Sequence, residues 1–134
     1  MTRPNTRGVR NNNPLNIRIG NNWLGEVPNP TDSEFEQFVS ITYGLRAGFC
    51  ILRRYINRYQ RDTVEKIIST WAPANENHTS LYIGYVCSKL DVEPDKVLEY
   101  SDTETMVKLV KAMAKFESAC DLKTEDILKA YKIA

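Results

Sequence analysis

The sequence of 134 residues has little of what several classes of protein require. It has one histidine, His78, and three cysteines far apart, Cys50, Cys87 and Cys120. A zinc site and a disulfide framework are therefore both disfavoured, and we expect the cysteines to be buried, reduced thiols. The formal net charge is only +1, which gives no strong field to attract nucleic acid. No apolar run is long enough to span a bilayer, so we expect no membrane insertion.

The start of the chain, MTRPNTRGVRNNN, also lacks the apolar segment of a signal peptide. We therefore expect synthesis in the cytosol without export by that route. The length predicts a single domain over residues 1–134, with a core that needs no disulfide or metal. We expect no cofactor, and the sequence leaves open whether residues 1–6 are ordered.

The hydrophobic pattern changes its period after residue 40. LNIRI and FEQFV alternate apolar and polar residues, which predicts a small β-hairpin within residues 15–40, preceded by a loop. The later spacing is helical and predicts core positions that include Tyr59 and Leu81. The pattern favours a mainly α (α+β) fold. The predicted helices cover 43–59, 62–71, 79–90, 101–119 and 124–131, the second and fourth opened by capping boxes at Asp62 and Ser101.

Glu117 is the residue that the helical pattern does not explain. When residues 101–119 are projected at about 100° per residue, Glu117 falls within an apolar arc, between Val110 and Met113. A carboxyl in such a setting gains partners or takes up a proton, because burial raises its pKa. A carboxyl protonated near neutral pH can act as a general acid in glycoside cleavage. The alternative, which periodicity alone favours, is that Glu117 escapes to solvent or pairs with Arg10, Arg18 or Arg46.

Several segments together resemble a family of phage and prophage proteins usually described as virion or structural proteins. They are RGVRNNNPLNIR, NNWLGEV, FEQFVSITYGLRAGFCILRRY, WAPANENHTSLY and AMAKFES, in this order. The family's usual wording is Asn-Asn-Pro-Gly-Asn-Ile-Arg, and the resemblance runs from about Arg7 to the C-terminus. It implies a phage-associated protein.

A more distant resemblance is to bacterial peptidoglycan glucosaminidases and lytic transglycosylases of lysozyme-like fold. Their glutamate-bearing helix comes before an Asn-rich turn, a Trp-x-Gly hairpin, an aromatic strand and a long helix. Here that helix comes last, as AMAKFES, so the chain resembles a circular permutation of the same fold. The resemblance implies a lysozyme-like helical domain with Glu117 as the catalytic acid. The matching turn, hairpin and strand residues are Asn12, Asn13, Asn16, Trp23, Gly25, Phe35 and Phe38.

Two positions depart from these patterns. Leu15 stands where the phage family has glycine, and Ala119 follows Glu117-Ser118 where a glycine is expected. The loss of that second glycine disfavours close approach of the backbone to a substrate. It favours weak activity, or a site that binds without cutting.

The asparagine-rich stretch then predicts one wall of a sugar-binding cleft, because asparagine amides both donate and accept hydrogen bonds. The alternative, given equal weight, is that these asparagines only hold the loop and Glu117 in place. Trp23 is a candidate for stacking on a sugar ring, with a core position as its alternative. Asn77 has helix capping as its alternative. The candidate substrate-binding residues are Asn12, Asn13, Asn16, Arg18, Trp23, Tyr43 and Asn77.

The identity of a second catalytic carboxylate is open. Glu26 and Glu36 are the main candidates, beside Asp32 and Glu34, and the alternative for Glu36 is a solvated strand position. A lytic transglycosylase, by resemblance, would use Glu117 alone. We therefore expect a protein that binds and cleaves peptidoglycan glycan strands at the bacterial cell wall, with other virion proteins as further partners. The rival hypotheses are an inactive virion component and a helical protein-interaction module.

Overall fold

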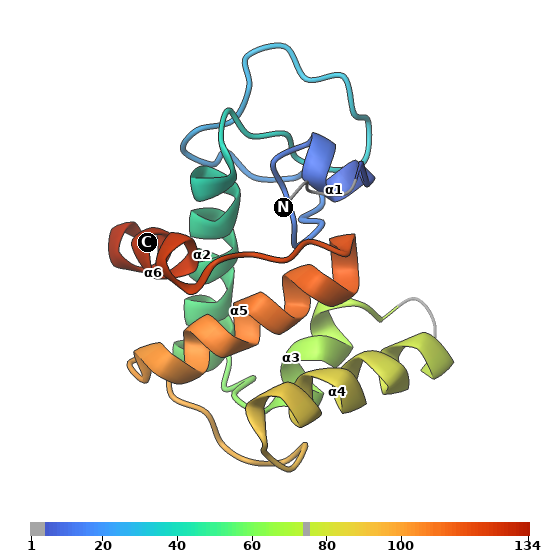
Figure 1. Cartoon of the computed structure of the whole chain (residues 1–134), viewed down its shortest axis with the longest axis vertical. Coiled ribbons are helices and arrows are strands. Elements are labelled where there is room, and N and C mark those ends of the chain that lie inside the picture. Colours follow the sequence, from blue (N-terminus) through green and yellow to red (C-terminus); the bar gives the residue numbers. More distant parts are fainter. Residues whose placement is uncertain (1–4, 74–75) are drawn as a thin grey trace.

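The computed structural model describes residues 5–73 and 76–134, and the side chains of residues 76 and 77 lie outside that description. Within it the chain is mainly helical, as the sequence predicts (Figure 1). The helices are α1 (Arg7–Arg10), α2 (Ile41–Asn57), α3 (Val64–Trp71), α4 (Glu76–Leu90), α5 (Thr103–Ser118) and α6 (Thr124–Ile133).

The helix starts lie close to the predicted ones, but the capping residues differ by one position. The Thr63 side chain accepts a hydrogen bond from the backbone N–H of Lys66 and so caps α3. Asp102 caps α5 by accepting from the backbone N–H and the hydroxyl of Thr105. The capping boxes predicted at Asp62 and Ser101 are therefore wrong, because the next residue supplies the cap in each case.

The predicted loop before residue 15 contains the short helix α1. The Thr6 side chain accepts from the backbone N–H of Val9, and Thr6 also donates its hydroxyl proton to the Ser118 carbonyl at 2.8 Å. This helix carries no periodic signal in the sequence, because four residues are shorter than the window in which a period can be recognised.

The segment from 15 to 40 does not form the predicted regular hairpin. Within the described residues its two halves meet through isolated antiparallel bridges, Arg18 with Phe35 and Glu26 with Phe38. The Asn13 side chain takes part of the pairing: it accepts from the Ile17 N–H and donates to the carbonyls of Ile17 and Glu36. A side-chain amide thus occupies backbone groups that a strand ladder would use.

The core lies between α2, α5 and their neighbours. In Figure 1, α6 lies beside α2, and α4 runs along α5, both pairs being in contact. Cys50, Cys87 and Cys120 are buried and are not joined in disulfides, as predicted. Two predicted core positions are wrong: Tyr59 is 53% exposed because α2 has already ended, and Leu81 is 67% exposed on α4. Fully buried side chains from α2 and α5 include Leu45, Phe49, Leu52, Met106, Leu109 and Met113.

This arrangement brings the N-terminal segment and the end of α5 together. In Figure 1 the C-terminal end of α5 points at the N-terminal segment, which lies as irregular loops beyond the helices. The Ser118 hydroxyl donates to the Pro14 carbonyl at 2.8 Å, and an added Cβ at Gly8 would lie 2.0 Å from the Ser118 hydroxyl oxygen. Because Gly8 has no side chain, Ser118 can approach it closely, and this approach also positions Glu117, the residue before Ser118.

Candidate functional site

A cleft of about 550 Å³ lies where the N-terminal segment, α2, the corner between α3 and α4, and the end of α5 meet. Three of the residues that the sequence singles out line it: Asn16, Arg18 and Glu117. The other lining residues are mostly aromatic or polar, and they include Asn21, Phe35, Tyr55, Thr70, Trp71 and His78.

Glu117 lies half-buried in the wall of this cleft. Burial raises the pKa of its carboxyl above the ordinary value, while the Asn16 amide, the Tyr82 hydroxyl and the charges of His78 and Arg18 lower it. The Tyr82 hydroxyl faces the carboxyl without meeting the full geometry of a hydrogen bond, so we regard Asn16 as the stronger partner. The net upward shift extends the protonated form toward neutral pH.

Two of the arginines weighed as partners of Glu117 donate elsewhere. Arg10 donates to the Asn5 carbonyl and Arg46 to the Ile133 carbonyl. Arg18 acts on Glu117 through its charge, and its own ion pair, at 3.4 Å, is with Glu34. Glu117 therefore keeps the position in the apolar face of α5 that its helical phase predicts.

Asn16 connects the N-terminal loop to Glu117. Its side-chain N–H donates to the Glu117 carboxyl at 3.1 Å and to the Glu117 backbone carbonyl at 3.2 Å. The backbone of Asn16 is left-handed, with φ of 53°, a conformation that asparagine tolerates better than most residues. Asparagine at this position therefore adopts the left-handed backbone of the turn and also donates a hydrogen bond to the Glu117 carboxyl.

The neighbouring asparagines hold the loop. Asn13 is fully buried, and its amide group is engaged with the backbone of Ile17 and Glu36, so it is placed to support the loop and not to touch a ligand. Asn12 is also left-handed, with φ of 52°, and donates to the Phe38 carbonyl. Of Asn12, Asn13 and Asn16, which are all predicted to contact substrate, the structure brings Asn16 alone into the cleft lining.

Aromatic rings from α2, α3 and the N-terminal segment contribute to the lining of the cleft. Tyr55 and Trp71 meet edge to face with ring centroids 6.0 Å apart, and the Trp71 indole N–H donates to the Leu15 carbonyl at 2.9 Å. Phe35 is covered by the Arg18 guanidinium at 4.7 Å from its centroid. Tyr55 and Trp71 were not predicted from the sequence, because nothing in the local pattern distinguishes either ring from the other aromatic residues of the helices.

Trp23 and Tyr43, both predicted to bind substrate, are not among the residues that line the cleft. Trp23 packs partly buried against the core, with the Arg54 guanidinium 5.5 Å from its ring centroid. The Tyr43 ring covers Gly25, where an added Cβ would lie 2.3 Å from it. The packing of Trp23 therefore favours a core position for this residue over stacking on a sugar ring. The side chain of Asn77 lies outside the described residues.

The candidate second carboxylates lie apart from the cleft lining. Glu36 is 4% exposed, so its solvated alternative is wrong. Burial, together with the hydrogen bond and charge of Glu26, raises the pKa of Glu36 to about 7. The Glu26 carboxyl also accepts from the backbone N–H of Trp23. Glu36, with the half-buried Glu26 beside it, therefore retains its proton to higher pH than an ordinary glutamate does.

Asp32 and Glu34 serve the N-terminal loop. Both oxygens of Asp32 accept from the Arg7 guanidinium at 2.7 Å, and Asp32 also accepts from the Asn11 amide. The Arg7 hydrogen bonds, followed by those of Asn11, hold the pKa of Asp32 far below its usual range. Glu34 pairs with Arg18 and lies 3.6 Å from Arg7. Their contacts are those of structural ion pairs.

The two departures from the resembled patterns have clear structural settings. Leu15 is fully buried and fits against Gly48 of α2, where an added Cβ would lie 2.4 Å from the Leu15 side chain. Ala119 ends α5 in the left-handed conformation, with φ of 53°. A glycine adopts this conformation at lower cost, so the expected glycine would suit the end of the helix itself.

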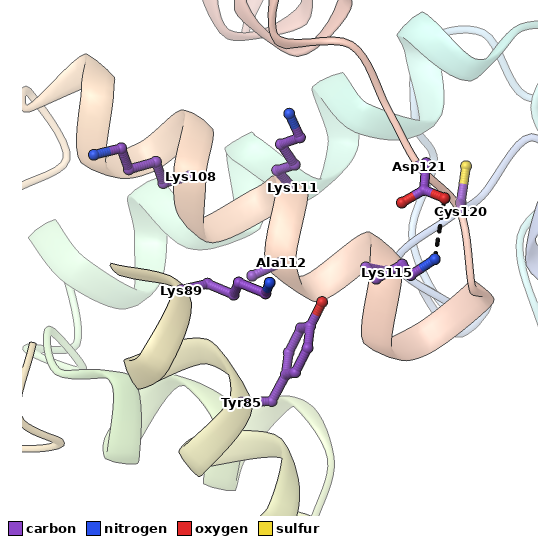
Figure 2. A pocket seen from close by; sticks show the side chains of 8 residues that line it. All are labelled: Tyr85, Lys89, Lys108, Lys111, Ala112, Lys115, Cys120 and Asp121. Atoms are coloured by element: carbon purple, nitrogen blue, oxygen red, sulfur yellow. Dashed lines mark hydrogen bonds and ion pairs between the residues drawn. The ribbon is translucent and has the colours of Figure 1, made fainter. Parts of the chain in front are cut away.

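Figure 2 shows a second, smaller hollow of about 250 Å³ between α4 and α5. Tyr85 and Lys89 reach from α4 toward Ala112 of α5, and Lys115 turns to an ion pair with Asp121 at 3.0 Å. Its lining residues, in the part of the chain that is described, are all different from those of the cleft. We refer to it as the lysine groove.

A metal-dependent site finds no support in the described residues, where no group of three or more His, Cys, Asp or Glu side chains is placed to hold an ion. None of the helices in residues 5–73 and 76–134 combines the length and apolar character that a membrane span requires. The site is therefore built from one carboxyl, side-chain amides, arginine and aromatic rings.

The fold and site together define a small, mainly helical domain with a half-buried carboxyl in a polar, aromatic-lined cleft. No model of a known protein family matches the sequence. The chain is 39% identical to protein P5 of the Pseudoalteromonas phage PM2 over 127 residues, which cover 92% of this chain and 78% of that protein. The chain belongs to the same family as this phage protein, so the expected kinship with phage proteins is confirmed.

Proposed function

We propose that the protein binds peptidoglycan glycan strands in the cleft and cleaves them, with Glu117 as the general acid. The observation that carries this proposal is the half-buried Glu117 carboxyl, whose pKa is raised by burial and which the Asn16 amide holds in place. A carboxyl of this kind can give its proton to the oxygen of a glycosidic bond. The resemblance of AMAKFES to the glutamate-bearing helix of lysozyme-like enzymes supports the same role.

The lining of the cleft suits a sugar polymer. Tyr55 and Trp71 offer apolar ring surface to sugar faces, and Asn16, Asn21 and Arg18 offer hydrogen-bond donors to hydroxyl and acetamido groups. No described helix presents a comparable combination elsewhere, because the lysine groove has one aromatic side chain and mainly ammonium groups.

The lone carboxyl favours a lytic transglycosylase over a hydrolase. Among the described side chains that line the cleft, Glu117 is the only carboxylate, whereas a typical glycoside hydrolase uses two. In a single-carboxyl mechanism, Glu117 protonates the leaving glycosidic oxygen. The 6-hydroxyl of the same muramyl residue then attacks its C1, and the Glu117 carboxylate takes up the proton that this hydroxyl releases. The product carries a 1,6-anhydro ring.

Membership of a phage protein family supports a setting in which the protein meets the cell wall. We propose that it reaches the wall within a virion, beside other virion proteins, or after the membrane has been breached. A virion component that binds glycan without cutting is the second candidate. The observation that favours it is Ala119, whose left-handed backbone beside Glu117-Ser118 lacks the expected glycine.

The test is peptidoglycan turnover by the wild-type protein and by the Glu117→Gln variant, with released muropeptides analysed by mass. The expected result is release of anhydro-muropeptides by the wild type and at least a 100-fold loss in the variant. The matched control is Glu104→Gln, the same change at an exposed position of α5 where the carboxyl pairs with Lys108.

Each outcome has a separate meaning. Products without the anhydro ring would replace the transglycosylase with a hydrolase. Binding of glycan by both proteins without release of products would leave the inactive virion component. Absence of binding to any glycan would overturn the proposal.

A further inference from the structure

Four arginines follow one another at the end of α2 and in the turn after it: Arg53, Arg54, Arg58 and Arg61. All are exposed, and each guanidinium lies over an aromatic ring. No ion pair joins any of them to a carboxylate in the described part of the chain, whereas Arg7, Arg18, Lys108 and Lys115 each have one. In a chain of net charge +1 this is a local surplus of positive charge.

The turn after α2 brings the guanidinium groups of Arg58 and Arg61 to the same aromatic ring, that of Tyr59. Gln60 is left-handed, with φ of 55°, and the Arg61 N–H donates back to the Tyr55 carbonyl at 2.7 Å. The chain therefore folds back over the helix end. As a result the guanidinium groups of Arg58 and Arg61 lie 5.9 and 5.5 Å from the ring centroid of the exposed Tyr59.

Tyr55 makes this surface continuous with the cleft. Its ring is part of the cleft lining, and the Arg61 guanidinium lies 5.6 Å from its centroid. Burial raises the pKa of the Tyr55 hydroxyl, and the positive charge of Arg61 opposes that rise. We call the surface formed by Tyr55, Arg58, Tyr59 and Arg61 the arginine edge of the cleft.

A guanidinium that rests on an aromatic face keeps its N–H edge free for a second partner. The partner that this edge fits best is a carboxylate, which can accept two parallel hydrogen bonds from one guanidinium. Stacking on the ring also limits the rotamers of the arginine, so less entropy is lost on binding. The arginine edge therefore offers two preformed carboxylate-binding groups beside a cleft that suits a polymer.

We propose that Arg58 and Arg61 bind the carboxylates of the short peptides attached to the glycan strand in the cleft. This inference rests on the proposed function. It concerns the peptides of the substrate, which the sugar-binding residues of the cleft do not contact. A glycan that runs past Tyr55 carries its peptide branches to the arginine edge, where their carboxylates meet unpaired positive charge. The protein is thereby selective for glycan that still bears its peptides.

The lysine groove is a weaker candidate for the same role. Lys108 and Lys115 already pair with Glu104 and Asp121, and in Figure 2 Lys108 and Lys111 point away from Lys89. The groove also lies on a separate stretch of surface, because its lining residues differ from those of the cleft. It supplies a matched control with basic residues outside the arginine edge.

The test measures the affinity of wild-type protein and of the Arg58→Ala/Arg61→Ala variant for three probes. They are purified glycan strands with their peptides, the same strands stripped of peptides by an amidase, and the soluble peptide alone. We expect the variant to bind peptide-bearing glycan at least ten-fold more weakly, to lose binding of the soluble peptide, and to bind stripped glycan as the wild type does.

Three further variants serve as controls. Arg53→Ala removes an arginine of α2 that lies over Tyr100 and not at the edge, and Lys89→Ala/Lys111→Ala removes charge from the lysine groove. Both are expected to leave the three affinities unchanged. Arg58→Lys/Arg61→Lys keeps the charge but not the planar fork, and should recover only part of the lost affinity.

The outcomes separate this inference from the proposed function. Equal affinity of wild type and double variant for peptide-bearing glycan overturns the arginine edge and leaves the cleft proposal intact. Arginine-dependent binding of the soluble peptide without any binding of glycan overturns the proposed function and keeps the edge. If the double variant loses affinity for single-stranded DNA and not for the peptide, the partner is a phosphodiester chain and the inference is overturned.

Discussion

The side-chain amide of Asn16 donates to both the carboxyl and the backbone carbonyl of Glu117, at 3.1 and 3.2 Å. This single amide thus fixes the carboxyl and the end of the helix that carries it. Because the hydrogen bond to the carboxyl lowers the Glu117 pKa against the rise caused by burial, Asn16 also sets how far that rise goes. The first prediction concerns this pair.

Replacing Asn16 by glycine removes the amide while keeping a residue that adopts φ of 53° easily. The Glu117 pKa should rise, and the alkaline limb of any pH–rate profile should move to higher pH, since a general acid works only while protonated. The rate below that limb should fall about 100-fold because the carboxyl is no longer held in place. NMR titration of the Glu117 carboxyl and a pH–rate profile measure both effects.

The matched variant Asn16→Ala loses the same amide and adds left-handed strain, so it should be less stable than Asn16→Gly by about 1 kcal/mol. Its Glu117 pKa should equal that of Asn16→Gly. A Glu117 pKa that stays at the wild-type value in both variants would contradict the role given to Asn16.

Asn13 is predicted to matter for stability and not for ligand binding. Asn13→Ala leaves the Ile17 N–H and the Glu36 carbonyl without their buried partner, whereas the Ile17 carbonyl keeps the hydrogen bond from the Glu36 N–H. Each unsatisfied group costs about 1–3 kcal/mol, so we expect a loss of about 3 kcal/mol in the free energy of unfolding by urea. Asn22→Ala, an exposed change in the same segment, should lie within about 0.5 kcal/mol of the wild type.

Ala119→Gly should stabilise the protein. The left-handed conformation costs a non-glycine residue about 1–2 kcal/mol, while glycine adds about 0.4–1 kcal/mol of unfolded-state entropy. The side chain of Ala119 is exposed, so little packing is lost. The expected gain is about 0.5–1 kcal/mol in urea unfolding. Ala119→Val should change stability in the opposite direction, and a destabilised glycine variant would show that the strain is not present in solution.

The raised pKa of Glu36 predicts an unusual dependence of the free energy of unfolding on pH. Its pKa in the folded protein is raised from 4.5 to about 7, so the folded state holds a proton that the unfolded state has already released. Stability should therefore fall as the pH rises from about 4.5 to 7. Glu36→Gln removes this dependence, and at pH 8 it should be more stable than the wild type by on the order of 2 kcal/mol.

Urea unfolding at pH 5 and pH 8 measures this effect. The raised pKa of Glu117 acts in the same direction, so the Glu117→Gln variant shows how much of the wild-type slope belongs to that residue. The Glu104→Gln variant should keep the full slope. A Glu36→Gln variant that is less stable than wild type at pH 8 would be incompatible with a shared proton between Glu36 and Glu26.

The position of Glu117 could be predicted from the sequence because helical phase is a local property. The phase placed this carboxyl among apolar residues of α5, and the structure finds it half-buried there. Asparagine tolerance of left-handed backbone is equally local, and it fits Asn12 and Asn16. The helices beyond residue 40 were predictable for the same reason.

The rest of the site depends on contacts between distant segments. Tyr55 and Trp71 belong to different helices, and neither helix shows which of its aromatic rings will face a cleft. Glu36 has the pattern of a solvated strand position, yet it is buried, with the Glu26 carboxyl beside its own. The predicted small hairpin is not confirmed, since its segments meet only through isolated antiparallel bridges. Alternation in LNIRI and FEQFV does not reveal that a side-chain amide replaces part of the ladder.

The hydrogen bond from Asn16 to Glu117 joins residues 101 positions apart, and that from Thr6 to Ser118 joins residues 112 positions apart. Contacts of such high contact order close the largest loops in the chain and are expected to form late in folding. Helices alone therefore leave the cleft unassembled, since its lining combines the N-terminal segment with residues of α2, α3 and the end of α5. A partly folded chain, whether newly made or partly denatured, can have nearly complete helical content and still lack the contact between Asn16 and the Glu117 carboxyl.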